Sequence, residues 1–180
     1  MLALVLETLG SDEMKTRSLS LVCIPAFALA MHAWGQSETH WEGYKRRTLQ
    51  SIIEMFGDEE FPDSSKNYAS LSGEMFPSKV KLVYLAKSRP LPANKKELLT
   101  SWTTSRGRPA TTVDLFPTEV LFREGTDEHW IAVQKPLLAS LPKEVKRGKS
   151  FDGYIIFMGT IKKVGEQKEW LFAMNEFDAP

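Results

Sequence analysis

The sequence predicts an α+β fold in which one or two N-terminal helices pack on a curled antiparallel β-sheet, or on a small partly open barrel, formed by the C-terminal half. Three observations carry this prediction. Apolar residues recur at helical spacing before residue 57 and again near residue 98, strand-like runs dominate from residue 113 onward, and glycines at positions 148, 153 and 159 mark points where a sheet can bend.

Residues 14–35 have the three parts of a secretory signal peptide. A basic pair precedes an apolar run at 19–31, and small residues stand three and one before a cut ahead of Gln36. The run is shorter than the roughly 20 apolar residues that a membrane span needs. We therefore expect cleavage that leaves no transmembrane segment and a single globular domain, residues 36–180, that is periplasmic or secreted.

Two other features of the N-terminus bear on this interpretation. Residues 1–13 carry three acidic residues and no basic one, which is unlike the start of a signal, so we interpret them as a mis-assigned extension ahead of a start at Met14. The alternative for the apolar run is a buried amphipathic helix. That helix would need polar residues at helical spacing, and residues 21–30 contain none.

Composition narrows the compartment and the class of partner. The chain has 23 basic and 23 acidic residues, and the cut removes two basic and three acidic ones, which leaves 21 against 20. So balanced a domain has no long-range field to attract nucleic acid or an anionic membrane. The only cysteine, Cys23, lies in the signal. A disulfide-free domain of this size fits the bacterial periplasm or medium.

The first half of the mature chain reads as helix, loop, strand and helix. Helical spacing predicts a helix over 41–56, followed by an irregular polar loop over 58–73. Residues 79–87 alternate and then become apolar, as in a strand that enters a core, and the prolines of 89–92 are expected to break it. A short helix is predicted over 94–102.

The second half reads as two strand pairs. Residues 118–123 and 129–134 flank a glycine-containing connection of hairpin length, and 151–158 and 168–174 form a second pair around a bend near residue 165. Between the pairs, 136–145 is expected to form a short helix or turn. In outline this arrangement resembles SH3-like or OB-like barrels, an analogy of architecture that carries no function.

The strand at 151–158 has apolar residues on both faces. Phe151, Ile155 and Phe157 alternate with Ile156 and Met158. We expect both faces of the strand to be buried. The alternative is one buried face and one exposed apolar face that is used for binding.

No pattern in the sequence points to a cofactor, a metal or a catalytic nucleophile. After the cut, His40 and His129 are the only histidines, and they have no ligand spacing. The Ser-x-x-Lys patterns at Ser78 and Ser140 lack a following Lys-Thr-Gly. A carboxylate pair for glycoside chemistry depends on separation in space, so it remains open for the acidic residues on or near strands, namely Glu119, Glu124, Asp152 and Glu176.

Five residues combine loop position with charge or aromatic area and are the candidate binding residues: Arg106, Arg108, Trp130, Lys146 and Arg147. Basic and aromatic residues together can hold single-stranded nucleic acid, but export and neutrality disfavour that ligand and leave an anionic glycan or lipid headgroup. We expect an exported, non-catalytic binding or accessory protein of the bacterial envelope or medium, whose partner is an unknown protein or an anionic envelope ligand. Two alternatives stay open, a small secreted hydrolase that uses a carboxylate pair and a carrier of an apolar ligand.

Overall fold

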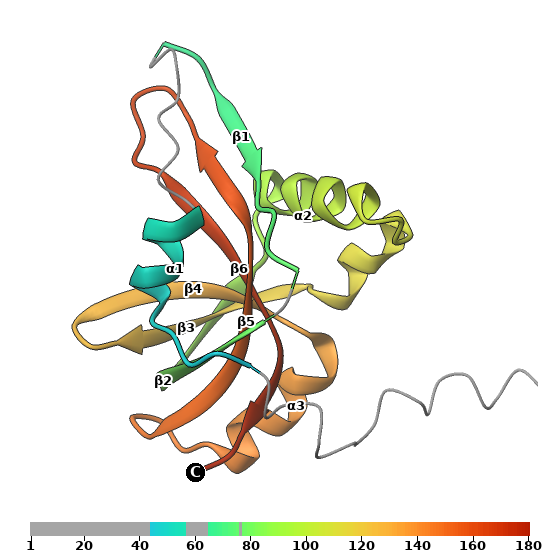
Figure 1. The fold of residues 1–180 in the computed structure, drawn as a ribbon. Coiled ribbons are helices and arrows are strands. Elements are labelled where there is room, and N and C mark those ends of the chain that lie inside the picture. The colour runs from blue at the N-terminus through green and yellow to red at the C-terminus, as the bar shows by residue number, and fades with distance from the viewer. Residues whose placement is uncertain (1–43, 57–64, 76) are drawn as a thin grey trace, which may run out of the picture. The chain divides into compact units, whose positions relative to one another are not determined.

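Five strands form a closed ring in the computed structural model, which describes residues 44–56, 65–75 and 77–180. They are β2 (Ser78–Pro90), β3 (Thr118–Glu124), β4 (Asp127–Val133), β5 (Ser150–Lys162) and β6 (Glu169–Asp178). The ring runs β2, β3, β4, β6, β5, and β5 pairs back with β2. The predicted small barrel is thus confirmed, together with its covering helices (Figure 1).

One strand pair of the ring is parallel. β4 and β6 run in the same direction, with Ala132 opposite Ala173 and Val133 opposite Met174. The helix α3 (Lys135–Glu144) connects β4 to β5, and the chain then returns along β6 to lie beside β4. This five-stranded Greek-key barrel is OB-like. The sheet was predicted to be antiparallel, and this one pair is the exception, because β4 and β6 meet only after the chain has passed through α3 and β5.

A sixth strand extends the sheet outside the ring. β1 (Tyr68–Leu71) pairs antiparallel with β5 from Gly159 to Lys162. Gly159 allows this close approach, since a Cβ atom there would lie 2.1 Å from the carbonyl oxygen of Ser70. β1 falls in the segment 58–73 that was predicted as a loop, because four residues carry too little alternation to mark a strand.

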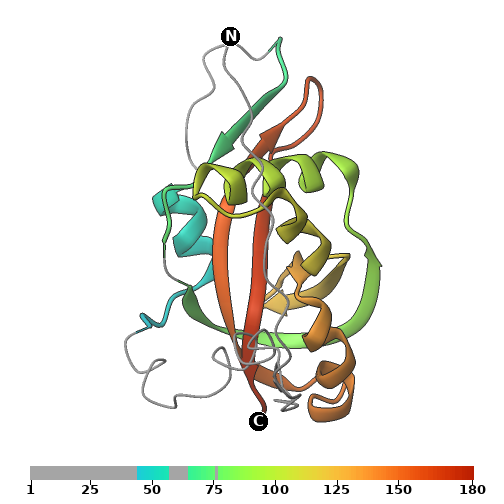
Figure 2. The ribbon, with the colours of Figure 1, turned by 90° about the vertical axis from the view of Figure 1, so that its right-hand side faces the viewer.

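Both faces of β5 are buried, as expected for 151–158. Phe151, Ile155 and Phe157 lie in the core inside the barrel, whereas Ile156 and Met158 belong to a second core. The second core is covered by α2 (Ala93–Ser105), which crosses β5 and β6 (Figure 2). A 3-10 helix, η2 (Ala110–Leu115), follows α2 and leads into β3.

Two helices contribute to the core inside the barrel. α1 (Leu49–Phe56) buries Leu49, Ile52 and Ile53 in it, and α3 adds Leu141. They approach this core from different sides (Figure 1).

Several boundaries differ from the prediction, each for a local reason. α1 begins at Leu49 and not near 41, because residues 45–47 are extended and hydrogen-bond the backbone of Lys79. β2 continues through residue 89 to Pro90, since a proline is tolerated as the last residue of a strand, where no ladder N–H is needed. β5 and β6 each run four residues further than predicted at their C-terminal ends.

The segments predicted as an extension, 1–13, and as a signal, 14–35, lie outside the described residues. The described residues belong to one compact, β-rich unit, residues 41–180. With one cysteine, the chain cannot form an internal disulfide. None of the described helices has both the length and the apolar character to cross a membrane.

Candidate binding groove

Arg106, a candidate from the sequence, joins the end of α2 to the loop after β1. Its Nη2 donates to the carbonyl oxygens of Ser72 at 2.6 Å and Glu74 at 3.2 Å. The guanidinium carbon lies 3.8 Å from the ring centroid of Trp102, and burial lowers the pKa of Arg106. These contacts hold the end of α2 against the loop after β1, which is a structural role.

The other four candidates come from different parts of the fold. Arg108 is exposed just beyond α2, and Trp130 is half-buried on β4, with the guanidinium of Arg89 4.3 Å from its ring centroid. Lys146 and Arg147 are exposed in the loop between α3 and β5. None of the five lines either of the two hollows described next.

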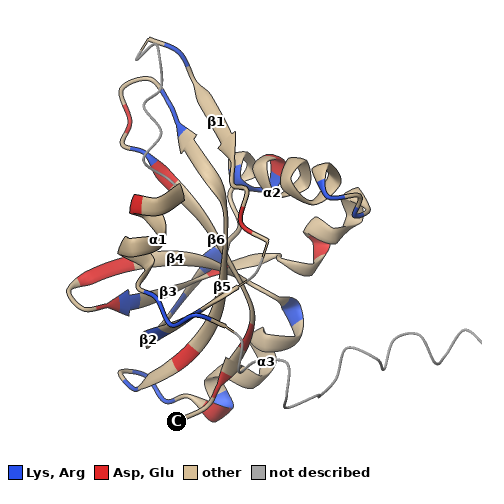
Figure 3. Ribbon diagram, viewed as in Figure 1, with Lys and Arg blue, Asp and Glu red and all other residues tan. Residues whose placement is uncertain are grey.

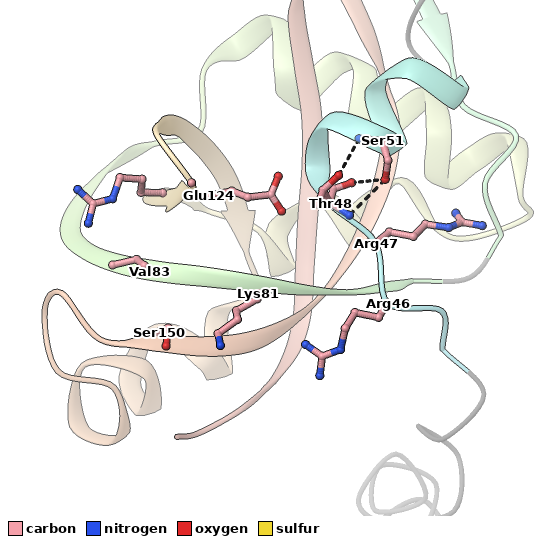
Figure 4. Close-up of a pocket in the computed structure, with 10 residues that line it drawn as sticks. Arg46, Arg47, Thr48, Ser51, Lys81, Val83, Glu124 and Ser150 are labelled. Carbon is pink, nitrogen blue, oxygen red and sulfur yellow. Dashed lines mark hydrogen bonds between the residues drawn. The ribbon is translucent and has the colours of Figure 1, made fainter.

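A groove of about 660 Å³ lies where the start of α1 meets β2, β3 and β5 (Figure 4). We call it the basic groove, because its lining holds one carboxylate, Glu124, and four cations: Arg46, Arg47, Lys81 and Arg123. A smaller hollow of about 300 Å³ adjoins it and shares Arg46, Lys81 and Ser150. Figure 3 shows the basic residues of the segment that leads into α1 and of neighbouring strands.

Strand register places part of this lining on one face of the sheet. Val83 of β2 lies opposite Arg123 of β3 on one side and opposite Ser150 of β5 on the other. Lys81 is two residues before Val83 and therefore points to the same face. Lys81 and Ser150 are both exposed and both line the groove (Figure 4).

Arg46 is fixed by a carboxylate. Its Nη1 and Nη2 each donate to Asp152 at 2.9 Å, which holds the pKa of Asp152 below its usual range. Next to this pair, Lys79 donates to Asp178 at 2.6 Å, and the hydroxyl of Tyr154 donates to the same carboxylate oxygen at 2.9 Å. The charge of Arg46 is therefore compensated within the protein.

Arg47 is also compensated. It lies 3.2 Å from the carboxylate of Glu74, which accepts a further hydrogen bond of 2.7 Å from the backbone N–H of Phe157. Burial raises the pKa of Glu74, and these two contacts oppose the rise.

The first turn of α1 is fully capped by the protein itself. Oε2 of Glu124 accepts from the backbone N–H of Leu49 at 2.8 Å, and burial raises the pKa of Glu124. Thr48 and Ser51 cap each other reciprocally, because each hydroxyl accepts from the other residue's backbone N–H. The N–H groups that a helix N-terminus can offer to an anion are thus already in use.

Lys81 and Arg123 are the remaining cations. Within the described part of the chain, neither side chain has an ion pair or hydrogen bond. Glu128 lies opposite Arg123 across β3 and β4, and Asp152, opposite Lys81, is held by Arg46. The basic groove therefore keeps two exposed positive charges without a bonded partner among these residues.

The acidic residues considered for catalysis do not form a pair that faces the groove. Glu119 is fully buried and lies 2.6 Å from Lys95 and 2.7 Å from Arg89. Glu176 lies on β6, where burial raises its pKa. Over residues 44–56, 65–75 and 77–180, no group of three His, Cys, Asp or Glu side chains is arranged to hold a metal ion.

Sequence reasoning missed the basic groove because its cations come from segments far apart in the chain. Arg46 and Arg47 fall within the helix that was predicted over 41–56. The alternation of residues 79–82 was the one available sign that Lys79 and Lys81 point outward from a strand. Comparisons of the chain with protein-family models, with curated proteins and with solved structures gave no match.

Proposed function

We propose that this chain is an exported, non-catalytic binding protein of the bacterial envelope or medium, and that the basic groove takes an anionic ligand. The observation that carries the proposal is the pair Lys81 and Arg123, two exposed cations at one groove in a chain of zero formal net charge. An anionic ligand would complement these two cations, since opposite charges across an interface attract.

Two features favour binding over the alternatives. The acids at the groove are engaged, Asp152 with Arg46 and Glu124 with α1, whereas a carboxylate pair for hydrolysis must face its substrate. A carrier needs an enclosed cavity, and the inside of this barrel holds tightly buried side chains such as Phe122, Phe157 and Phe172.

Binding is tested with three soluble polyanions: phosphorylated dextran, polygalacturonate and dextran sulfate. The domain should bind at least one of them, with an affinity that falls as salt rises. Changing Lys81→Glu together with Arg123→Glu should weaken binding by about a hundredfold, because each of the two lost contacts to a charged group contributes on the order of 1.5 kcal/mol.

The matched control is Lys96→Glu with Lys135→Glu, which changes the net charge equally at exposed positions on α2 and α3 that do not line the groove. This control should bind nearly as well as the unchanged protein. Absence of binding to all three polymers, or an equal loss in both double variants, would refute the proposal.

Export is tested by the intact mass of the protein recovered from cytosol, periplasm and medium after expression of the whole chain. A mass that begins at Gln36 outside the cytosol supports the proposal. An uncleaved mass confined to the cytosol contradicts it.

A further inference from the structure

We infer that the anion taken by the basic groove is a phosphoryl group, contacted by Lys81, Arg123 and the hydroxyl of Ser150. This inference rests on the proposed function and narrows its ligand class. The three side chains come from β2, β3 and β5, which are neighbours in the sheet.

Strand spacing brings the three donors around one point. Adjacent strands lie about 4.8 Å apart, and Val83 stands between Arg123 and Ser150 in the same row. Lys81 and Arg123 are diagonal neighbours, a relation that separates backbone positions by about 7–8 Å and is within reach of long side chains. An oxyanion above Val83 can therefore be contacted from both sides.

The number and kind of donors favour a phosphoryl group over a carboxylate. A carboxylate has two oxygens and one charge, and within this protein a single guanidinium, that of Arg46, binds both oxygens of Asp152. A phosphoryl group carries up to two charges and three strong acceptor oxygens. Two cations and a hydroxyl on three strands match this larger demand, since arginine forks and lysine point charges both bind phosphate.

The other possible anion-binding groups around the groove are already engaged, which leaves the side chains of Lys81, Arg123 and Ser150. The α1 N-terminus, a usual phosphate site, is closed by Glu124 and by the Thr48 and Ser51 caps. Arg46 keeps its place through Asp152, so it borders the site as part of a neutral pair. The half-buried Val83 gives the floor an apolar centre, against which carbon atoms next to a phosphate can pack.

The experiment compares phosphorylated dextran, whose phosphate monoesters each have three free oxygens, with polygalacturonate at an equal concentration of anionic groups, using the full chain and calorimetry. Phosphorylated dextran should bind about tenfold more tightly, because a carboxylate leaves one charged donor unmet. Lys81→Met should remove this preference and Lys81→Arg should retain it. Ser150→Ala should reduce it, since the hydroxyl is the one neutral donor of the three.

The outcomes separate this inference from the proposed function. If polygalacturonate binds as tightly as phosphorylated dextran, the phosphoryl assignment is wrong and anionic binding stands. If neither polymer nor dextran sulfate binds, both fail. Sedimentation with phosphatidic acid vesicles, against phosphatidylcholine vesicles as the control, identifies the source. Vesicle binding that inorganic phosphate displaces assigns a lipid headgroup, and phosphate-sensitive binding of phosphorylated dextran alone assigns a soluble phosphate ester.

Discussion

The carboxylate of Glu124 accepts a hydrogen bond of 2.8 Å from the backbone N–H of Leu49, and so ties the first turn of α1 to the end of β3, 75 positions along the chain. α1 has eight residues, fewer than an isolated helix needs in water. Its position therefore depends on burial of its apolar face and on this bond. Because the start of α1 forms a wall of the basic groove, Glu124 also shapes the proposed site.

Replacement of Glu124 should destabilise the domain. Glu124→Ala removes the acceptor for the first turn, and we expect a loss of about 1–2 kcal/mol in the free energy of unfolding, as for other lost helix caps. Glu124→Gln keeps an acceptor and should cost less. Urea denaturation measures both, and Glu128→Ala, exposed on the same hairpin, is the control. Equal losses at Glu124 and Glu128 would contradict the cap.

Glu74 should make stability fall as pH rises. Burial raises its pKa in the folded state above the ordinary value of 4.5, so the folded protein binds this proton more readily than the unfolded chain. The associated stability is present below pH 4.5 and is lost as pH rises through the raised pKa. Glu74→Gln removes this dependence.

Urea denaturation at a series of pH values above 4.5 measures the Glu74 effect. The difference in unfolding free energy between Glu74→Gln and the unchanged protein should move in favour of the variant as pH rises. Glu97→Gln, an exposed change on α2, is the matched control. A constant difference for Glu74→Gln would show that this carboxyl does not titrate as proposed.

The buried pair Lys95 and Glu119 should be sensitive to removal of one partner. Their side chains are 5% and 0% exposed, and Nζ lies 2.6 Å from Oε1. Glu119→Gln leaves the lysine charge without its main partner, which should cost about 3–5 kcal/mol. Glu169→Gln, whose carboxylate lies 3.9 Å from the same Nζ and is 41% exposed, should cost less than about 1 kcal/mol. Lys95→Met combined with Glu119→Leu should recover most of the loss, and failure to recover would mean that packing, not charge, dominates.

A side chain at position 159 should destabilise the domain. A Cβ atom there meets the backbone oxygen of Ser70, so Gly159→Ala must displace β1 and should cost about 1–3 kcal/mol, as overpacking does. In Gly153→Ala the nearest atoms belong to the side chains of Met174, at 3.1 Å, and Leu82, at 3.3 Å, which can shift. Thermal unfolding should therefore show a larger loss at 159 than at 153, and the reverse order would contradict the close approach of β1.

Replacement of Arg106 should lower the stability of the domain without changing its affinity for polyanions. Arg106→Ala removes two hydrogen bonds to the loop after β1 and the stacking on Trp102, and should lower the unfolding free energy by about 1–3 kcal/mol. Polyanion affinity should not change, because Arg106 lies outside the groove. A loss of affinity in the folded variant would restore Arg106 as a binding residue.

The sequence by itself determined the local features of this protein. Alternation within 118–134 predicted the hairpin, and apolar residues at both parities of 151–158 predicted a strand buried on two faces, because strand periodicity is read from neighbours in the chain. β1 and the late start of α1 escaped prediction. Four residues carry too little pattern, and the segment before α1 is held in an extended form by Lys79, which lies on another element.

Only the tertiary structure decided how the barrel closes and where charge remains. The parallel contact of β4 with β6 completes the ring after an intervening helix and strand. Arg46 meets Asp152 across 106 positions, so the sequence could count these charges without showing that they cancel. Nor could the sequence show that Lys81 and Arg123 lack an ion pair among the described residues, because that conclusion requires the partners of the neighbouring charges to be known. Coulomb attraction acts through space, and separation along the chain does not reveal it.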